Sequence, residues 1–313
     1  MPSQLKPSSS QAPAQRVRRC PLRRFIPYRV QSAFTLIELL VVISIIALLV
    51  SIVLPGLSRC RILAKRSREF AAAQQLVAAF TVYSNDNKSG ILPGYATAAS
   101  TSATPPPGVR PLVVVDNKGD RVYGQTARRY PWRIAPYIDY NFRGLYDDDK
   151  ILERYQERAD VQYAVSISPA LGINAEFVGG KSQPGLGFND NSIRAYGQFY
   201  VTRLDQVRSA NKLMAFVSAR GVDVESGQGG SGVIAGFHTV DAPSVTAPVW
   251  STAAYADDAP PDQFGQVHPR FFSKATAAHL DGHVEGFSID ELRDMRRWSN
   301  NATRADWVLG GPN

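Results

Sequence analysis

In this 313-residue chain, the type and position of Glu38 suggest a chemical role. It is the single charged residue in the largely apolar run of 21 residues from Phe34 to Leu54. A carboxylate costs roughly 2.5–3.5 kcal/mol at the centre of a bilayer and less near its surface. We therefore expect Glu38 to have a partner and a function.

A chain break between Ala33 and Phe34 would supply that partner. The new α-amino group of Phe34 would be a cation at neutral pH. If this amine paired with Glu38 of a neighbouring subunit, the buried pair would favour one axial register of the packed helices over others. The alternative interpretation is that the Glu38 side chain extends to the membrane surface and has no role in assembly.

A second group of chemically capable residues lies near the C-terminus. Three of the four histidines fall within 16 residues together with an aspartate: His268, His279, His283 and Asp281. On a helix, His279 and His283 would be one turn apart and could share a zinc ion. The Asp281-Gly282 pair between them indicates a turn instead, so we predict hairpin packing with hydrogen bonds and no metal site.

Motifs typical of catalysis do not occur in the sequence. The chain has no His-Glu-x-x-His pattern, no Gly-x-Ser-x-Gly pattern, no Walker loop and no dinucleotide fingerprint. We therefore expect no catalytic residues, no cofactor and no enzymatic activity.

The positive charge of the chain is concentrated at its start. The chain has 35 basic and 27 acidic residues, and residues 1–33 hold seven of the basic and none of the acidic ones. The rest of the chain is therefore almost neutral, and a nucleic acid is not expected as a partner. Residues 1–33 are also rich in Ser, Pro and Gln, which is typical of a basic leader peptide.

The apolar run from Phe34 to Leu54 is long enough to cross a membrane. A bilayer core about 30 Å thick needs roughly 20 helical residues. A secretory signal peptide has a shorter apolar region with the small residue of its cleavage site after it, whereas here Ala33 precedes the run. The basic leader predicts a single-pass protein with residues 1–33 in the cytoplasm and residues 85–313 across the membrane.

The segment Ala33-Phe34-Thr35-Leu36-Ile37-Glu38 and the apolar helix after it resemble the N-terminal motif of type IV pilins and type II secretion pseudopilins. The resemblance implies cleavage after Ala33 by a prepilin peptidase of the bacterial inner membrane and N-methylation of Phe34. It also implies assembly with other pilin or pseudopilin subunits, with Glu38 as the assembly residue. The family usually has Gly at the position of Ala33; without cleavage the protein would stay a signal-anchored monomer.

The helix is predicted to continue from the membrane into a globular head. Residues 57–83 contain neither Pro nor Gly, and Phe70, Ala73, Val77 and Phe80 form an apolar stripe at helical spacing. We expect one helix over residues 34–84, with its second half docked on the head. The opposite, polar face is expected to carry Arg61, Lys65, Arg68, Glu69 and Gln75.

Residues 85–313 predict an α+β head built on an antiparallel sheet with long loops. The clearest hairpin is Ala275–Phe287, where Asp281-Gly282 suits a type I′ turn. It is followed by a capping box, Ser288 with Glu291 three residues later, which begins a short helix. Further strand predictions are the hairpin 111–124 and the segments Val161–Ile167, Lys212–Ser218 and Val233–Phe237.

Asp281-Gly282-His283 resembles a second signature, found near the C-terminus of many proteins that share the prepilin-type N-terminus. In those proteins nine residues separate a preceding His from the Asp-Gly pair, whereas twelve separate His268 from Asp281 here. This resemblance implies a pseudopilin-like surface protein and carries no particular activity.

Together these patterns predict a pseudopilin or minor pilin of the inner membrane with its head in the periplasm. Two alternatives stay open at this point. One is a signal-anchored periplasmic hydrolase that uses His268, His279 and His283 as a metal site. The other is a minor pilin that takes up DNA.

Overall fold

The structure is a computed structural model that describes residues 34–146, 152–153, 160–182, 190–222 and 232–311. The basic leader and Ala33 lie outside the described residues. The chain divides into two compact units, Met1–Leu54 and Pro55–Asn313. The described part of the first unit consists of Phe34, Thr35 and the start of helix α1, which runs over Leu36–Asp86. This helix is long and apolar enough at its start to cross a membrane.

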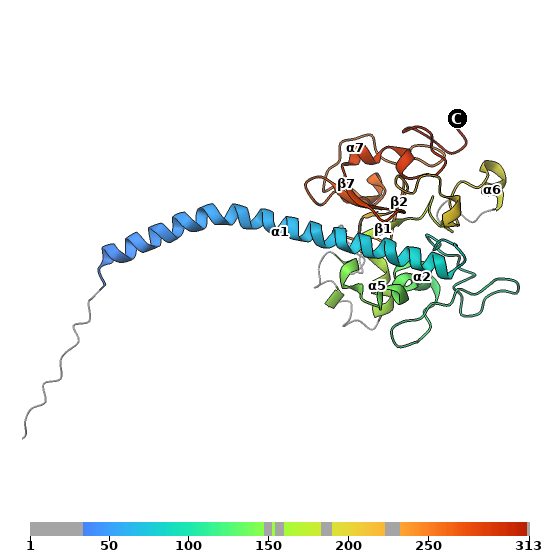
Figure 1. Ribbon diagram of the computed structural model, residues 1–313, viewed down its shortest axis with the longest axis horizontal. Coiled ribbons are helices and arrows are strands. Elements are labelled where there is room, and N and C mark those ends of the chain that lie inside the picture. Colours follow the sequence, from blue (N-terminus) through green and yellow to red (C-terminus); the bar gives the residue numbers. More distant parts are fainter. Residues whose placement is uncertain (1–33, 147–151, 154–159, 183–189, 223–231, 312–313) are drawn as a thin grey trace, which may run out of the picture. The chain divides into compact units, whose positions relative to one another are not determined.

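In the second unit, the remainder of α1 buries one face in the head (Figure 1). The predicted stripe is confirmed at Ala73, Val77 and Phe80, which are all buried. Glu69 is also buried, so its placement on the polar face is wrong. The reason is helical spacing: Glu69 precedes Leu76 by seven residues, or two turns, and therefore belongs to the docked face.

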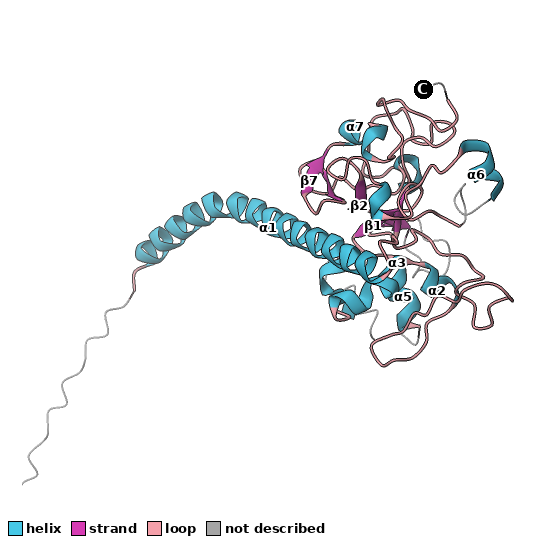
Figure 2. Ribbon diagram, turned by 45° about the vertical axis from the view of Figure 1, so that its right-hand side comes forward, coloured by secondary structure: helices cyan, strands magenta, loops and turns pink. Residues whose placement is uncertain are grey.

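A five-stranded sheet forms the centre of the head (Figure 2). Three of its four pairings are antiparallel, as predicted, and one edge strand adds in parallel. The α+β fold class is confirmed. Most of the head is loop, as Figure 2 shows in pink. In sheet order the strands are β5 (Thr239–Val240), β1 (Leu171–Asn174), β2 (Met214–Ser218), β6 (Ala275–His279) and β7 (Val284–Phe287).

Short helices and a second small sheet surround this centre. The two-stranded sheet pairs β3 (Arg220–Val222) with β4 (Val233–Ala235). The α-helices are α2 (Gly124–Arg128), α3 (Tyr130–Ile134), α5 (Val161–Ile167), α6 (Asp190–Tyr196) and α7 (Ile289–Leu292). The 3-10 helices are η1 (Ala135–Ile138), η2 (Phe142–Leu145), η3 (Leu204–Gln206), η4 (Pro261–Phe264) and η5 (Met295–Arg297).

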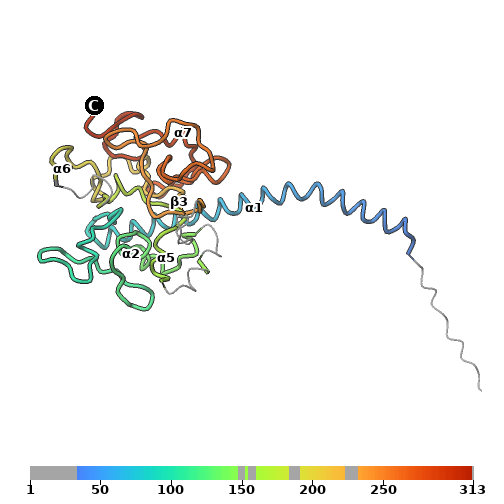
Figure 3. Tube along the Cα trace, turned by 180° about the vertical axis from the view of Figure 1, so that it is seen from behind, coloured from blue at the N-terminus to red at the C-terminus, as the bar shows by residue number. Residues whose placement is uncertain are grey.

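Each face of the sheet packs against its own hydrophobic cluster. Successive strand residues point to opposite faces, so Ala278 joins the cluster around α1, α2, α3 and α5, whereas Ala277 joins the cluster under α7. A register shift in β2 turns both Ala215 and Phe216 toward the α1 side. There the Phe216 ring meets Phe80 of α1 edge-on at 5.8 Å. Figure 3 shows this part of α1 between the α2–α5 side and the sheet.

A buried polar cluster ties α1 to the sheet. Glu69 Oε2 lies 3.4 Å from Nη1 of Arg270, and both side chains are almost fully buried. The Ser218 hydroxyl of β2 donates to Glu69 Oε1 and accepts from the backbone N–H of Thr276 in β6. Arg270 Nη2 donates to the carbonyl oxygens of Ala170 and Ala219. One carboxylate on α1 thus connects the helix, two strands and a loop.

Several local predictions are confirmed and others are wrong. Strand β2 confirms Lys212–Ser218, and β4 covers the start of Val233–Phe237. The predicted strand Val161–Ile167 is wrong, since this segment is helix α5. The segment is only seven residues long, so its apolar pattern fits a helix as well as a strand. Its contacts with α2 and α3 place Ala164 and Val165 in the core and select the helix. The predicted hairpin 111–124 is reduced to a single bridge between Val115 and Arg121.

The Ala275–Phe287 hairpin is confirmed, but its turn is not type I′. That turn needs positive φ at both central residues, and of the Asp-Gly pair only Gly282 has it, at 94°. The backbone N–H of Gly282 donates to the carbonyl of His279, and the N–H of His279 donates to the carbonyl of His283. This is a three-residue connection, in which Gly282 supplies the left-handed conformation that closes it.

Candidate functional site

Thr35 and Glu38 form the N-terminal cap of α1. The Oε2 atom of Glu38 accepts hydrogen bonds from the backbone N–H and the hydroxyl of Thr35, at 2.9 and 2.8 Å. In return, the backbone N–H of Glu38 donates to Thr35 Oγ1 at 3.2 Å. This reciprocal pattern is a capping box, which satisfies two backbone donors that a helix start otherwise leaves unpaired.

This cap was not predicted from the sequence, although Thr35-Leu36-Ile37-Glu38 has the same pattern as the predicted capping box at Ser288 and Glu291. The cap uses one of the two carboxylate oxygens of Glu38. Among the described residues, Oε1 accepts no hydrogen bond. Phe34 itself is exposed. Capping and pairing with a neighbouring amine are therefore compatible uses of the same side chain.

Residues 28–54 match the prokaryotic N-terminal methylation motif. The N-terminus is a prepilin-type signal. The motif makes this segment similar to the N-terminus of type IV pilins and pseudopilins, and together with the apolar half of α1 it supports membrane anchoring. The motif also implies processing by a prepilin peptidase and assembly with pilin subunits. No curated protein and no solved structure matches the chain.

The residue roles within this motif remain predictions. Ala33 lies outside the described residues, so the structure does not place the residue before the expected cut. Three roles are untested by the structure: cleavage between Ala33 and Phe34, methylation of Phe34 and the assembly role of Glu38.

The β6–β7 hairpin brings together the histidines of the second signature. His279 and His283 form a cross-strand pair, because the N–H of His279 donates to the carbonyl of His283 at 3.0 Å. Their imidazole rings stack with centroids 4.0 Å apart and planes 9° apart. Glu285 is two residues beyond His283 on the same strand and therefore lies on the same face. The ligand-type atoms of these three residues all lie within 4.8 Å of one another.

Asp281 in the turn orients the His283 ring. Its Oδ1 lies 2.6 Å from His283 Nδ1 and also accepts from the backbone N–H of His283. Partial burial raises the pKa of Asp281, but these hydrogen bonds outweigh it and hold the pKa below its ordinary value. Asp281, Gly282 and His283 thus work as one turn, in which the ionised carboxylate fixes the imidazole.

His279 is the buried end of this group. The side chain is 1% exposed, and among the described residues the Lys212 backbone is the hydrogen-bonding group beside its ring, which leaves one buried ring nitrogen without a partner. Burial, with the neighbouring His283 adding to it, lowers the pKa of His279 to about 4, while the Lys212 backbone and Asp281 oppose the shift more weakly. The ring is therefore neutral at pH 7, and its nitrogen lone pair is available to a ligand.

His268 does not join the other two histidines. His279 pairs with Met214 at one end of β2, whereas the N–H of His268 donates to the carbonyl of Ser218 at the other end. The two ends are four positions apart along the strand, a distance of about 13 Å. The three-histidine metal site of the hydrolase alternative is therefore not assembled.

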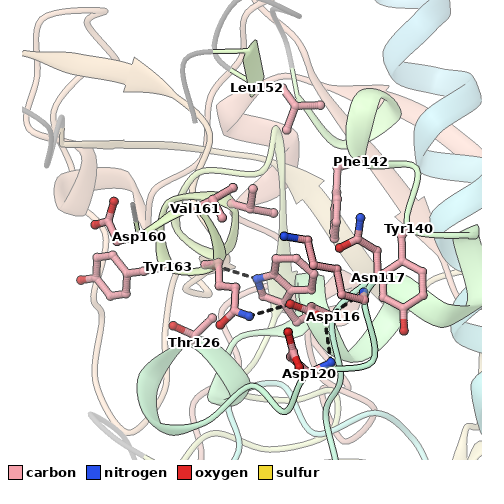
Figure 4. A pocket seen from close by; sticks show the side chains of 14 residues that line it. Asp116, Asn117, Asp120, Thr126, Tyr140, Phe142, Leu152, Asp160, Val161 and Tyr163 are labelled. Atoms are coloured by element: carbon pink, nitrogen blue, oxygen red, sulfur yellow. Dashed lines mark hydrogen bonds between the residues drawn. The ribbon is translucent and has the colours of Figure 1, made fainter. Parts of the chain in front are cut away.

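The head also has a cavity of about 560 Å³ between the 116–120 turn and α5 (Figure 4). Its central carboxylate, Asp116, is already fully used: Oδ1 accepts from the N–H groups of Lys118 and Asp120, and Oδ2 accepts from Gln162 Nε2. Burial raises the pKa of Asp116, but these hydrogen bonds bring it below its ordinary value. The polar groups of the cavity hold a turn against a helix, which accounts for them without a ligand.

Proposed function

We propose that this protein is a pseudopilin or minor pilin, a structural subunit of a type II secretion-like pseudopilus or a type IV pilus-like filament, without enzymatic activity. The observation that carries the proposal is the prepilin-type motif at residues 28–54, with its acid at the fifth position after the expected cut. The anchor lies in the bacterial inner membrane and the head in the periplasm.

Assembly in this proposal depends on a carboxylate with two uses. Cleavage after Ala33 turns the peptide nitrogen of Phe34 into an ammonium group. The Oε1 atom of Glu38 in the adjacent subunit receives that cation, while Oε2 keeps its hydrogen bonds to Thr35. The Phe34 ammonium group and the Glu38 carboxylate are both buried between the packed helices. An axial register that separates them would leave each charge buried without its partner and is strongly disfavoured.

Three substitutions separate assembly from capping. Glu38→Val removes both uses of the acid and should leave membrane insertion intact but abolish recovery of the protein in sheared filaments. Thr35→Val removes the side-chain cap alone and should leave recovery largely unchanged. Glu291→Val is the matched control, because it deletes the carboxylate of a second capping box, at Ser288 in the head.

The readouts are the intact mass of membrane-extracted protein and its amount in the sheared fraction. We expect the mass to lack residues 1–33 and to include one added methyl group. A native protein that retains its leader, or Glu38→Val recovered from filaments at the wild-type level, would contradict the proposal.

A further inference from the structure

We infer that the β6–β7 hairpin binds one divalent transition-metal ion of the zinc class through His279, His283 and Glu285. This site is separate from the assembly function proposed above and does not depend on it. Two imidazoles and one carboxylate are a ligand set that suits Zn²⁺ and leaves a fourth position for water or another donor. The inference contradicts the sequence-based expectation of no metal site.

The strand register provides the arrangement. His279 and His283 face each other across the hairpin, and Glu285 follows on the same face. Their donor atoms already lie within 4.8 Å of one another. Ligands bonded to a tetrahedral Zn²⁺ at about 2.0–2.2 Å lie roughly 3.5 Å apart. Glu285 is exposed and free to rotate toward the two imidazoles, and metal binding requires the donor atoms to close that difference.

Asp281 prepares His283 as a ligand. When Nδ1 of His283 donates its proton to Asp281 at 2.6 Å, the lone pair of the neutral ring is on Nε2. A carboxylate behind the imidazole is the usual support of a metal-bound histidine, which it orients and makes more basic. The turn therefore supplies a ligand together with its supporting hydrogen bond.

His279 is the observation that points to a ligand rather than to packing alone. Both of its ring nitrogens are buried, and the backbone of Lys212 can satisfy only one of them. A buried polar atom left without a partner is costly, and a metal ion would satisfy it. The ligand-type atoms of His279 lie within 4.8 Å of those of His283 and Glu285, the two exposed members of the group.

The charges around the group favour a cation on balance. Glu285 and Asp281 are acidic, whereas Arg297 is the nearby base that disfavours protonation of His279. The Arg297 guanidinium lies over the Phe287 ring at 4.0 Å, and its Nε donates to the carbonyl oxygen of Glu291.

The test uses the full-length protein in detergent, purified with a tag that contains no histidine, in a background where both cysteines are replaced, Cys20→Ser and Cys60→Ser. That background removes an exposed thiol that would itself bind zinc. The protein is stripped with a chelator and titrated with Zn²⁺ by calorimetry, and bound metal is counted by mass spectrometry. Replacement by Co²⁺ then reports the ligand geometry through its visible absorption bands.

We expect one ion per chain, with stoichiometric binding lost in His283→Ala and weakened in Glu285→Gln. Asp281→Asn should retain the site but bind about 10–100-fold more weakly. Asp290→Asn, which removes an exposed acid outside the group, is the matched control and should bind like the parent. His283→Ala and Glu285→Gln are solvent-facing changes, so unfolding is monitored by tryptophan fluorescence rather than assumed.

Less than stoichiometric uptake by the stripped protein would overturn the inference, and so would folded His283→Ala that binds like the parent. Neither result would affect the proposed function, because sheared-filament recovery and the intact mass do not depend on this hairpin. Conversely, failure of the Glu38 experiment would leave the metal site standing.

Discussion

Removal of the Glu69 side chain should destabilise the head strongly, although hydropathy places this residue on the exposed face of α1. The side chains of Arg270 and Glu69 are 6% and 5% exposed, and their closest charged atoms are 3.4 Å apart. Removing one partner of a buried ion pair costs about 3–5 kcal/mol, because the other charge stays buried without compensation. Arg270 keeps its bonds to two carbonyl oxygens, so we expect Glu69→Ala to lie near the lower end, at about 3 kcal/mol.

The free energy of unfolding can be measured by guanidinium titration of the full-length protein in detergent, followed by tryptophan fluorescence. All four tryptophans lie in the second unit, so the signal reports the head. Gln74→Ala is the control: Gln74 is exposed on the same helix and should change stability by less than about 0.5 kcal/mol.

A double substitution tests the reasoning itself. Arg270→Met should be as harmful as Glu69→Ala, since it leaves the carboxylate buried without its cation. Glu69→Leu combined with Arg270→Met should recover much of the loss, because apolar groups of similar size often replace a buried pair without penalty. A Glu69→Ala protein within about 1 kcal/mol of wild type would refute the argument.

Three further predictions concern the head. Burial above all, with Arg129 adding to it, lowers the pKa of His238 to about 3. As the pH falls, the His238 side chain is therefore protonated in the unfolded chain before it is protonated in the folded protein. The free energy of unfolding should be unaffected by this group above about pH 6.5 and should fall below it by up to about 1.4 kcal/mol per pH unit. Unfolding titrations at several pH values should therefore show a shallower loss between pH 6.5 and 4 for His238→Gln. Ser288→Ala removes the α7 cap and should cost about 1 kcal/mol in the same titration. Gly179→Ala should cost about 3 kcal/mol, because Gly179 has φ of 78° and an added Cβ would lie 2.1 Å from the carbonyl oxygen of Leu92.

Each of these has its own check. An unchanged pH slope in His238→Gln would mean that another group carries the proton uptake. Ser288→Thr keeps the hydroxyl and should restore most of the α7 cap. Gly108→Ala also has positive φ, at 83°, but open space around it, so its cost should be only about 1–2 kcal/mol. Equal losses at Gly108 and Gly179 would show that backbone strain, not the close approach to Leu92, determines the effect.

Local patterns in the sequence determined the N-terminal segment, the apolar helix, the 275–287 hairpin and the Ser288 cap. In each of them the deciding interactions join residues that are close in the chain, so residue type and spacing are enough. The Thr35–Glu38 cap is of the same kind and was recognisable from its pattern. Membrane insertion likewise depends on the composition of a single run of residues.

Only the tertiary structure decided what depends on residues far apart in the chain. The burial of Glu69 depends on Arg270, and the α5 segment is helical where its own apolar pattern also allows a strand. The pairing of β1 with β5 joins segments more than sixty residues apart. A short sequence window contains none of these partners, because packing across the whole head selects them.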